Sequence, residues 1–248
     1  MNKNSGALSD NDFKTLRSFD TPTICNVIEL FEYQPQSVGY MDGRIRCCFP
    51  KMKPMVGFAS TATTRLAAPS LGKSGYEMLP QQFEAFAEIP SPAVVVFQDL
   101  DDPPVAATFG EIMCSSYQAF GAAGLITSGA GRDLDQVEAL DFPVFTGCTI
   151  CSHAYPSIVE IHTPIRVGGL IVRPGDLIHA DLNGVATIPI EIAADVARVC
   201  QEFVDTEEII MKYLRSTKKP NVDEYKKVFK ESADLRNKMK QRLSHAGK

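Results

Sequence analysis

The chain has 248 residues, of which 22% are charged and 44% hydrophobic, and its formal net charge is −5. This size allows one large domain or two small ones, with a core that needs no metal or disulfide to stabilise it. The acidic balance argues against a general nucleic-acid binder, and no long uncharged apolar run indicates a membrane span.

The N-terminal segment is polar and precedes a predicted helix. Residues 1–6 lack the apolar core of a secretion signal, so we expect a cytoplasmic protein that begins with a flexible segment over residues 1–17. Residues 21–30 predict a helix, with Thr21 as N-cap and Pro22 at the first helical position.

The middle of the chain alternates strands with helices. Runs of β-branched or alternating residues predict strands at 55–64, 93–99 and 124–127. The run at 93–99 is uncharged until its last residue, Asp99, which is typical of a strand buried on both faces. Helices are predicted around these strands, at 76–87, 111–121 and 133–140.

Consecutive strands follow, and helices end the chain. Further strands are predicted at 142–145, 164–172, 177–181 and 184–188. A long helix follows, because apolar residues recur at roughly helical spacing at Ile192, Val196, Val199, Phe203 and Ile210. The charged segment after residue 220 predicts a last helix, either a solvated face or an oligomer contact. This mixture predicts a layered α/β domain with a mixed sheet.

The seven cysteines are scattered and odd in number, which is not a disulfide framework. Cys148, Cys151 and His153 have the spacing of half a zinc site, but no second CxxC pair completes it. Buried, reduced thiols are the other interpretation. We expect structural roles for three histidines and a solvated position for the last: His153, His162, His179 and His245.

The most informative segment joins a glycine-rich turn, 128–131, to Arg132 and Asp133. Small residues let the backbone bend sharply and let a ligand approach closely. The segment 110–113 predicts the opening of a helix, whose amides suit an anion. A guanidinium, a carboxylate and such a helix start together favour a small oxo-acid held on a divalent cation.

Several motifs in order resemble the family of the 4-hydroxy-4-methyl-2-oxoglutarate aldolases and the regulator of ribonuclease E activity A. They are residues 109–113, 122–126, 129–133, 142–145 and 173–185, with 39–45 and 56–59 extending the likeness. The resemblance covers residues 18–215 and leaves 216–248 as a C-terminal helical extension. It implies a swivelling-domain-like mixed sheet with flanking helices, assembled as a homotrimer or a hexamer with sites at subunit boundaries.

The resemblance also implies an activity. Catalytic members are divalent-metal aldolases that release pyruvate from 4-hydroxy-4-methyl-2-oxoglutarate or a related 4-hydroxy-2-oxo acid, and they decarboxylate oxaloacetate. Regulator members lack the full site and bind a ribonuclease and helicases. A non-catalytic interaction protein is therefore the alternative hypothesis, and an enzyme of the same type with a diverged substrate is a third.

The family's site residues map onto this sequence one by one. Asp133 matches the direct ligand of Mg²⁺ or Mn²⁺, and its alternative role is a helix N-cap. Arg132 matches the catalytic residue that contacts the oxo-acid, and its alternative is a surface salt bridge. Glu208 matches an acid that reaches a neighbouring subunit's metal through water; its alternative is an ion pair with Lys212. The stretch whose amides hold the pyruvate carboxylate is Gly110, Glu111, Ile112 and Met113.

The sequence also departs from the catalytic pattern. Glu111 stands where catalytic members usually have a second glycine, and its carboxylate would repel an anion unless it points away. Three amides stand where acids are common, which lowers the negative charge that outer carboxylates supply to a water-held metal: Asn26, Gln136 and Asn183. Asp99 and Asp181 are the remaining candidates for contacting the metal's outer ligands.

Overall fold

The computed structural model describes residues 8–69 and 75–244, which form two compact units. One unit comprises Met1–Val38 and Ile190–Lys248, and the other comprises Gly39–Pro189. This division differs from the predicted boundaries at residues 17 and 215. The N-terminal helices pack on the long helix near the C-terminus, so the two ends of the chain share one unit.

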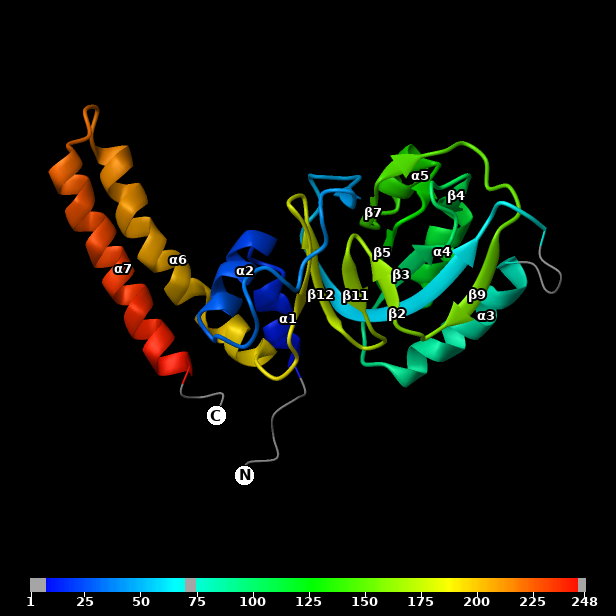
Figure 1. Ribbon diagram of the computed structural model, residues 1–248, viewed down its shortest axis with the longest axis horizontal. Helices are drawn as coiled ribbons and strands as arrows, with labels where there is room; N and C mark the ends of the chain where they lie inside the picture. Colours follow the sequence, from blue (N-terminus) through cyan, green and yellow to red (C-terminus); the bar gives the residue numbers. More distant parts are fainter. Residues whose placement is uncertain (1–7, 70–74, 245–248) are drawn as a thin grey trace, which may run out of the picture. The chain divides into compact units, whose positions relative to one another are not determined.

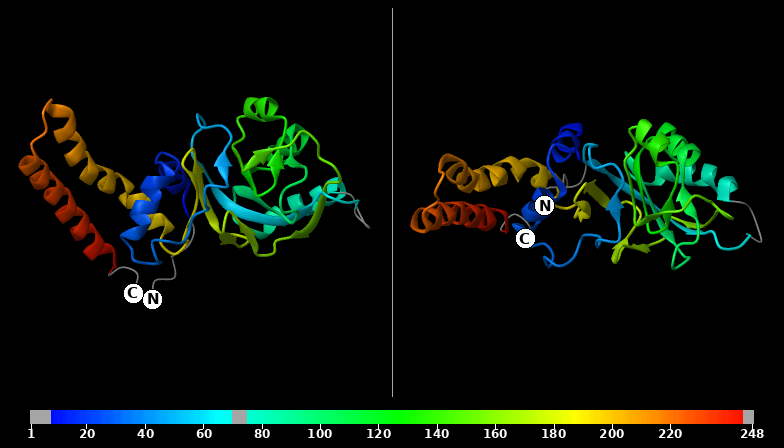
Figure 2. Two further views of the ribbon diagram at one scale, coloured as in Figure 1. Left: turned by 45° about the horizontal axis from the view of Figure 1, so that its top comes forward. Right: turned by 90° about the horizontal axis from the view of Figure 1, so that it is seen from above.

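The first unit is helical, with α1 (Asp10–Leu16), α2 (Thr21–Glu29), α6 (Ala193–Ser216) and α7 (Val222–Ser244). The helices α6 and α7 lie side by side in every view (Figure 1, Figure 2), and Arg242 pairs with Glu202 between them at 2.6 Å. The helices predicted at both ends of the chain are confirmed. Among the described residues, no helix combines the length and apolar character needed to cross a bilayer.

Two details at the N-terminus correct the sequence analysis. The predicted flexible segment is wrong for residues 10–16, because Ser9 and Asp12 form a reciprocal capping box that begins α1. Residues 1–7 and His245 lie outside the described chain. The helix α2 begins at Thr21, but its N-cap is Asp20, whose carboxylate accepts the amide of Thr23 at 2.9 Å.

The second unit is built on a mixed sheet of eight strands in the described part of the chain. Four strands are parallel neighbours, and they are β7 (Val144–Thr146), β5 (Ala122–Thr127), β3 (Ala93–Asp99) and β2 (Met55–Arg65). The others pair antiparallel at the edges of this group: β1 (Arg46–Cys47), β9 (Ser157–Ile161), β12 (Leu177–Asp181) and β13 (Gly184–Ile188).

Both faces of this sheet are covered. One face packs on α3 (Gly75–Ala85), η1 (Phe86–Glu88), α4 (Glu111–Ala119) and α5 (Leu134–Ala139) through a cluster that includes Tyr117 and Val137. The hairpin of β10 (Ile165–Val167) and β11 (Leu170–Val172) packs on the other face. Val94–Phe97 are fully buried as a result, which confirms the prediction for β3.

A small parallel sheet extends three strands of the large one. It consists of β4 (Ala107–Phe109), β6 (Ala130–Gly131) and β8 (Cys148–Thr149), which follow β3, β5 and β7 along the chain. The carboxyl ends of parallel strands are where open α/β sheets most often bind ligands. The predicted layered α/β fold with a mixed sheet, flanking helices and a C-terminal helical extension is confirmed.

Candidate active site

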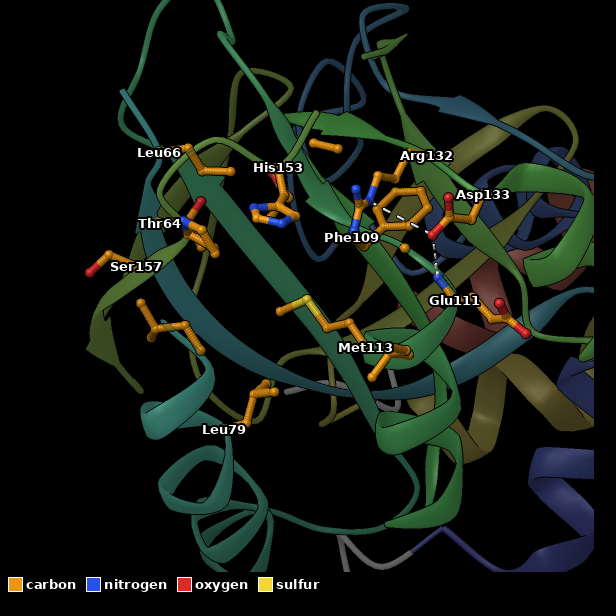
Figure 3. Close-up of a pocket in the computed structure, with 16 residues that line it drawn as sticks. Thr64, Leu66, Leu79, Phe109, Glu111, Met113, Arg132, Asp133, His153 and Ser157 are labelled. Carbon is orange, nitrogen blue, oxygen red and sulfur yellow. Dashed lines mark hydrogen bonds and ion pairs between the residues drawn. The ribbon is translucent and has the colours of Figure 1, made fainter. Parts of the chain in front are cut away.

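A partly open pocket with a cavity volume of about 120 Å³ lies at these carboxyl ends (Figure 3). Its walls come from the starts of α4 and α5, from α3 and from the segment that leads into β9. All six residues predicted for the substrate and metal site within this unit line it: Gly110, Glu111, Ile112, Met113, Arg132 and Asp133. The structure therefore brings together two segments that are separated by about a helix and a strand in the sequence.

The junction between β6 and α5 presents Arg132 and Asp133 to the pocket. The amide of Arg132 donates to the carbonyl of Phe109 at 3.1 Å, which ties this junction to the end of β4. Gly131 packs against the ring of Phe109 so closely that a Cβ there would lie 2.2 Å from the ring. Asp133 has a left-handed backbone (φ 54°, ψ 40°), a conformation that Asp adopts more readily than most residues. These features fix the direction of both side chains.

The carboxylate of Asp133 caps α4, not α5. Asp133 is the N-cap of α5 by position, as the alternative interpretation predicted, but its side chain makes no capping bond there. Its Oδ2 accepts the amide of Glu111 at 3.1 Å and lies 3.7 Å from Nε of Arg132. The N-cap of α4 is Gly110, which has no side chain to do this, and a Cβ there would lie 2.6 Å from Asp133 Oδ2. A carboxylate at the start of α5 therefore caps the start of α4.

The charges of the site suit a cation and an anion together. The side chains of Arg132 and Asp133 are 29% and 39% exposed, so both reach the pocket while remaining partly shielded. Mg²⁺ usually takes one or two protein carboxylates and completes its coordination with water and substrate oxygens. Asp133 fits that requirement, because one hydrogen bond from Glu111 leaves most of its oxygen lone pairs available. Among residues 8–69 and 75–244, no three His, Cys, Asp or Glu side chains gather as a metal site.

The other predicted metal-related residues lie elsewhere. Glu208 is on α6, in the helical unit, where it pairs with Arg215 at 3.0 Å instead of with Lys212. The amides that replace family acids do not line the pocket, and neither does Asp181. They are Gln136 and Asn26, exposed on α5 and α2, and Asn183, whose side chain donates to Asp181 in the turn between β12 and β13.

Asp99 lies beneath the glycine-rich turn. It ends β3 and is 8% exposed, with Oδ1 accepting the amide of Asp101 at 3.0 Å. Its Oδ2 has no hydrogen-bond partner within the described chain and packs against Gly129, where a Cβ would lie 2.6 Å from it. Burial raises the pKa of Asp99 to about 6. Asp99 packs against the turn at Gly129 and does not line the pocket.

The structure adds four polar residues to the pocket that were not predicted for it: Thr64, Thr108, His153 and Ser157. Thr64 lies at the end of β2, and its buried Oγ1 has no partner within the described residues. Since Thr64 is the register partner of Asp99, the rule that ligands bind at parallel strand ends could have found it. His153 also lines the pocket but comes from an irregular loop, for which the sequence carries no positional signal.

Ser60, His162 and Glu88 form a second polar chain away from the pocket. His162 lies 3.0 Å from the hydroxyl of Ser60 and 3.1 Å from the carboxylate of Glu88. The order resembles a catalytic triad, yet Ser60 is 0% exposed inside β2, so no substrate reaches its hydroxyl. This arrangement agrees with the structural role predicted for His162.

Comparison with known proteins shows the family of the chain. Residues 21–187 match the model of the RraA-like family, described as Aldolase/RraA. This match covers more than half of the chain. The chain belongs to the RraA-like family.

Relatives and solved structures agree with this assignment. The chain is 38% identical over 100 residues to a "Putative 4-hydroxy-4-methyl-2-oxoglutarate aldolase" of Halalkalibacterium halodurans. This alignment covers 40% of this chain and 48% of that protein. It is 33% identical over 84 residues to a protein of the same name from Alcanivorax borkumensis, covering 34% and 52%. The alignments thus span about half the length of these curated relatives.

A crystal structure of RraAS2 from Streptomyces coelicolor, described as an unusual member of the RNase ES inhibitor RraA protein family, has a TM-score of 0.65. The match covers 81% of this chain and 96% of that one at 20% identity. An uncharacterized protein from Pseudomonas syringae has a TM-score of 0.69 at 19% identity, covering 91% and 97%. At this level of identity the likeness establishes the RraA-like fold, in agreement with the fold implied by the sequence motifs.

Proposed function

We propose that this RraA-like protein is a divalent-metal-dependent aldolase. Its substrate would be 4-hydroxy-4-methyl-2-oxoglutarate or a related 4-hydroxy-2-oxo acid, which it would cleave to pyruvate, and it would also decarboxylate oxaloacetate. The observation that carries the proposal is the meeting of Arg132, Asp133 and the start of α4 in one pocket. The names of the two bacterial relatives support the same reaction class.

The chain's own groups account for binding of the pyruvate half. The amides of Ile112 and Met113 belong to the first turn of α4, whose N–H groups have no acceptor within the helix. They would hold the substrate carboxylate, with the positive end of the helix dipole behind them. Asp133, anchored by the amide of Glu111, would hold Mg²⁺ or Mn²⁺. When bound, the cation supplies a Lewis acid that polarises the keto oxygen.

Arg132 would act on the charge that develops during the reaction. Its backbone amide is bound to the carbonyl of Phe109, and its Nε lies 3.7 Å from Oδ2 of Asp133, which would orient the guanidinium before substrate binds. A preorganised donor aimed at a developing enolate oxygen typically contributes about 3–4 kcal/mol to catalysis, equivalent to roughly 10²–10³ in rate. This contribution falls on both aldol cleavage and decarboxylation, because the two reactions share the pyruvate enolate.

Glu208 would complete the site from a neighbouring subunit of a homotrimer or hexamer, by holding a metal-bound water. Its carboxylate is oriented by Arg215 at 3.0 Å on the same helix. The ligand of the site completed in this way would be a small 2-oxo acid.

Replacing Arg132 tests the proposal. Arg132→Ala should abolish oxaloacetate decarboxylation with Mg²⁺ while the circular dichroism spectrum and the oligomeric state stay those of the wild type. Arg166→Ala, at an exposed position of β10 outside the pocket, serves as the matched control and should keep full activity. Unchanged turnover in Arg132→Ala would overturn the assignment.

A non-catalytic regulatory protein is the second candidate, and Glu111 is the observation that favours it. Its exposed carboxylate lines the pocket at the start of α4, beside the amides proposed to bind an anion. Calorimetric titration with Mg²⁺ and oxalate separates the two candidates. Binding of oxalate only in the presence of Mg²⁺ supports the enzyme, and binding of neither supports the interaction protein.

A further inference from the structure

We propose that His153 is a further catalytic residue of this pocket, and that its imidazole takes the proton of the substrate's C4 hydroxyl during aldol cleavage. This inference rests on the proposed aldolase function and deepens it. The sequence by its pattern predicts only a structural role for His153. The structure instead places an imidazole in the wall of the same pocket as Arg132 and Asp133.

The loop that carries His153 is held on both sides by elements that line the pocket. The carbonyl of Ser152 accepts the amide of Ala107, at the start of β4, at 2.7 Å. The amide of Tyr155 donates to the carbonyl of Leu66, next to the end of β2, at 3.1 Å. In the view of Figure 3 the imidazole lies between Thr64 and Arg132, and all three side chains line one pocket. The ring is therefore presented from an anchored loop.

A hydrogen bond fixes which ring nitrogen can act as a base. Nδ1 of His153 lies 3.0 Å from the carbonyl oxygen of Ala154, which can only accept a hydrogen bond. Nδ1 therefore carries the proton, and Nε2 is the basic nitrogen of the neutral ring. This is the arrangement in which general-base histidines are oriented by a backbone or carboxylate acceptor.

The backbone at Ala154 maintains this orientation against a local cost. Ala154 has a φ of 42°, in the left-handed region, which costs about 1–2 kcal/mol for a residue with a Cβ. Its amide donates to Oγ of Ser152 at 3.1 Å, which holds the turn. Strained backbone of this kind concentrates at functional sites, where the surrounding structure imposes it. Here it directs a carbonyl at the histidine ring.

Among the described residues, three other charged side chains line the pocket, and they are compared with His153 as candidates for the base. Arg132 is a permanent cation, and the carboxylate of Asp133 is the group proposed to hold the metal. Glu111 is an exposed carboxylate at the start of α4. Imidazole is the side chain most often used for general acid–base catalysis, and its contribution is typically about 10²–10⁴ in rate.

The proposed step balances as a retro-aldol cleavage. Nε2 takes the proton of the C4 hydroxyl, the oxygen electrons form the new C=O bond at C4, and the C3–C4 bond breaks. The electron pair of that bond goes to the pyruvate half as an enolate, which Arg132 stabilises. The enolate carbon then takes a proton from solvent, and the imidazolium returns its proton to solvent.

The test compares two reactions on one variant. Oxaloacetate has no C4 hydroxyl, so its decarboxylation does not need this base. His153→Asn should lower kcat for cleavage of 4-hydroxy-4-methyl-2-oxoglutarate by about 10²–10³ with a KM change below about threefold. It should retain oxaloacetate decarboxylation and the calorimetric affinity for oxalate. Tyr155→Phe, on the same loop with an exposed ring outside the pocket, is the matched control and should retain both activities.

A readout without metal or turnover tests the geometry. Long-range ¹H–¹⁵N spectra of the metal-free protein should show the neutral ring of His153 protonated at Nδ1. Retained aldol cleavage in His153→Asn, equal loss of both reactions, or protonation at Nε2 would overturn the inference while the proposed function stands. A wild type inactive on both substrates would overturn the proposed function, and this inference with it.

Discussion

The β4–α4 and β6–α5 junctions are neighbours with the same construction, a short parallel strand that leads into a helix. They differ in what they present to the pocket. The β4–α4 junction has Gly110, which has no side chain, as N-cap and offers backbone amides beside the side chain of Glu111. The β6–α5 junction offers the side chains of Arg132 and Asp133 and leaves its own helix without a side-chain cap. One junction supplies mainly main-chain donors, and the other supplies the paired guanidinium and carboxylate.

This difference explains why the two segments depend on each other. The start of α4 would have an uncapped amide at Glu111 if Asp133 did not accept it at 3.1 Å. Asp133 in turn would move freely if that bond did not hold it beside the amides. A helix cap, worth about 1 kcal/mol in stability, thus also positions the carboxylate proposed to hold the metal.

The largest expected effect comes from changing Asp133, because it separates the two roles. Asp133→Asn keeps an acceptor for the amide of Glu111 and tolerates the left-handed backbone, but it removes the charge. We expect a loss of Mg²⁺-dependent turnover of at least about 100-fold, with the free energy of unfolding within about 0.5 kcal/mol of wild type. Asp133→Ala should in addition cost about 1 kcal/mol or more, measured by urea denaturation.

Gly110→Ala should disturb the site more than the fold. The new Cβ would lie 2.6 Å from Oδ2 of Asp133 and 3.1 Å from Nε of Arg132, and both atoms belong to side chains that can move away. We expect turnover to fall by about 10-fold or more, while stability falls by about 1 kcal/mol. Gly43→Ala is the matched control, since a Cβ there meets nothing within 4 Å. Equal losses in both variants would contradict the model of mutual dependence.

Asp99→Asn tests the support beneath the β6–α5 junction through pH. Because burial raises its pKa to about 6 from the ordinary 3.8, the folded state holds a proton between these values that the unfolded state has lost. The wild type should therefore lose stability as pH rises from about 4 to about 6, by about 3 kcal/mol. Asp99→Asn should be more stable than wild type at pH 7 by a similar amount, and equal to it near pH 4. Urea denaturation at the two pH values measures the difference.

The smallest expected effect on stability concerns Glu208, outside both junctions. Its ion pair with Arg215 is partly exposed, so Glu208→Gln should change the free energy of unfolding by less than about 0.5 kcal/mol. If Glu208 holds metal-bound water in the assembled protein, calorimetric Mg²⁺ affinity should fall by about tenfold. An unchanged affinity would leave the two junctions as the complete metal site.

The secondary-structure elements and the main site residues could be predicted from the order of the amino acids. The β-branched run at 93–99, the strands at 177–181 and 184–188 and the long helix after residue 192 are all present, because their hydrophobic patterns allow few other burial arrangements. The ordered motifs around Arg132 and Asp133 led to the family that the comparisons show.

How these residues contact one another could not be predicted and depends on the folded arrangement of the chain. That Asp133 caps α4, that Asp99 is buried under the turn, and that His153 enters the pocket all depend on contacts between segments far apart in the sequence. Local patterns reflect the burial of one element at a time, whereas a shared cap or a pocket wall forms only when strands are placed in register. The same reason explains why α1 and α2 belong with α6 and not with the sheet that follows them.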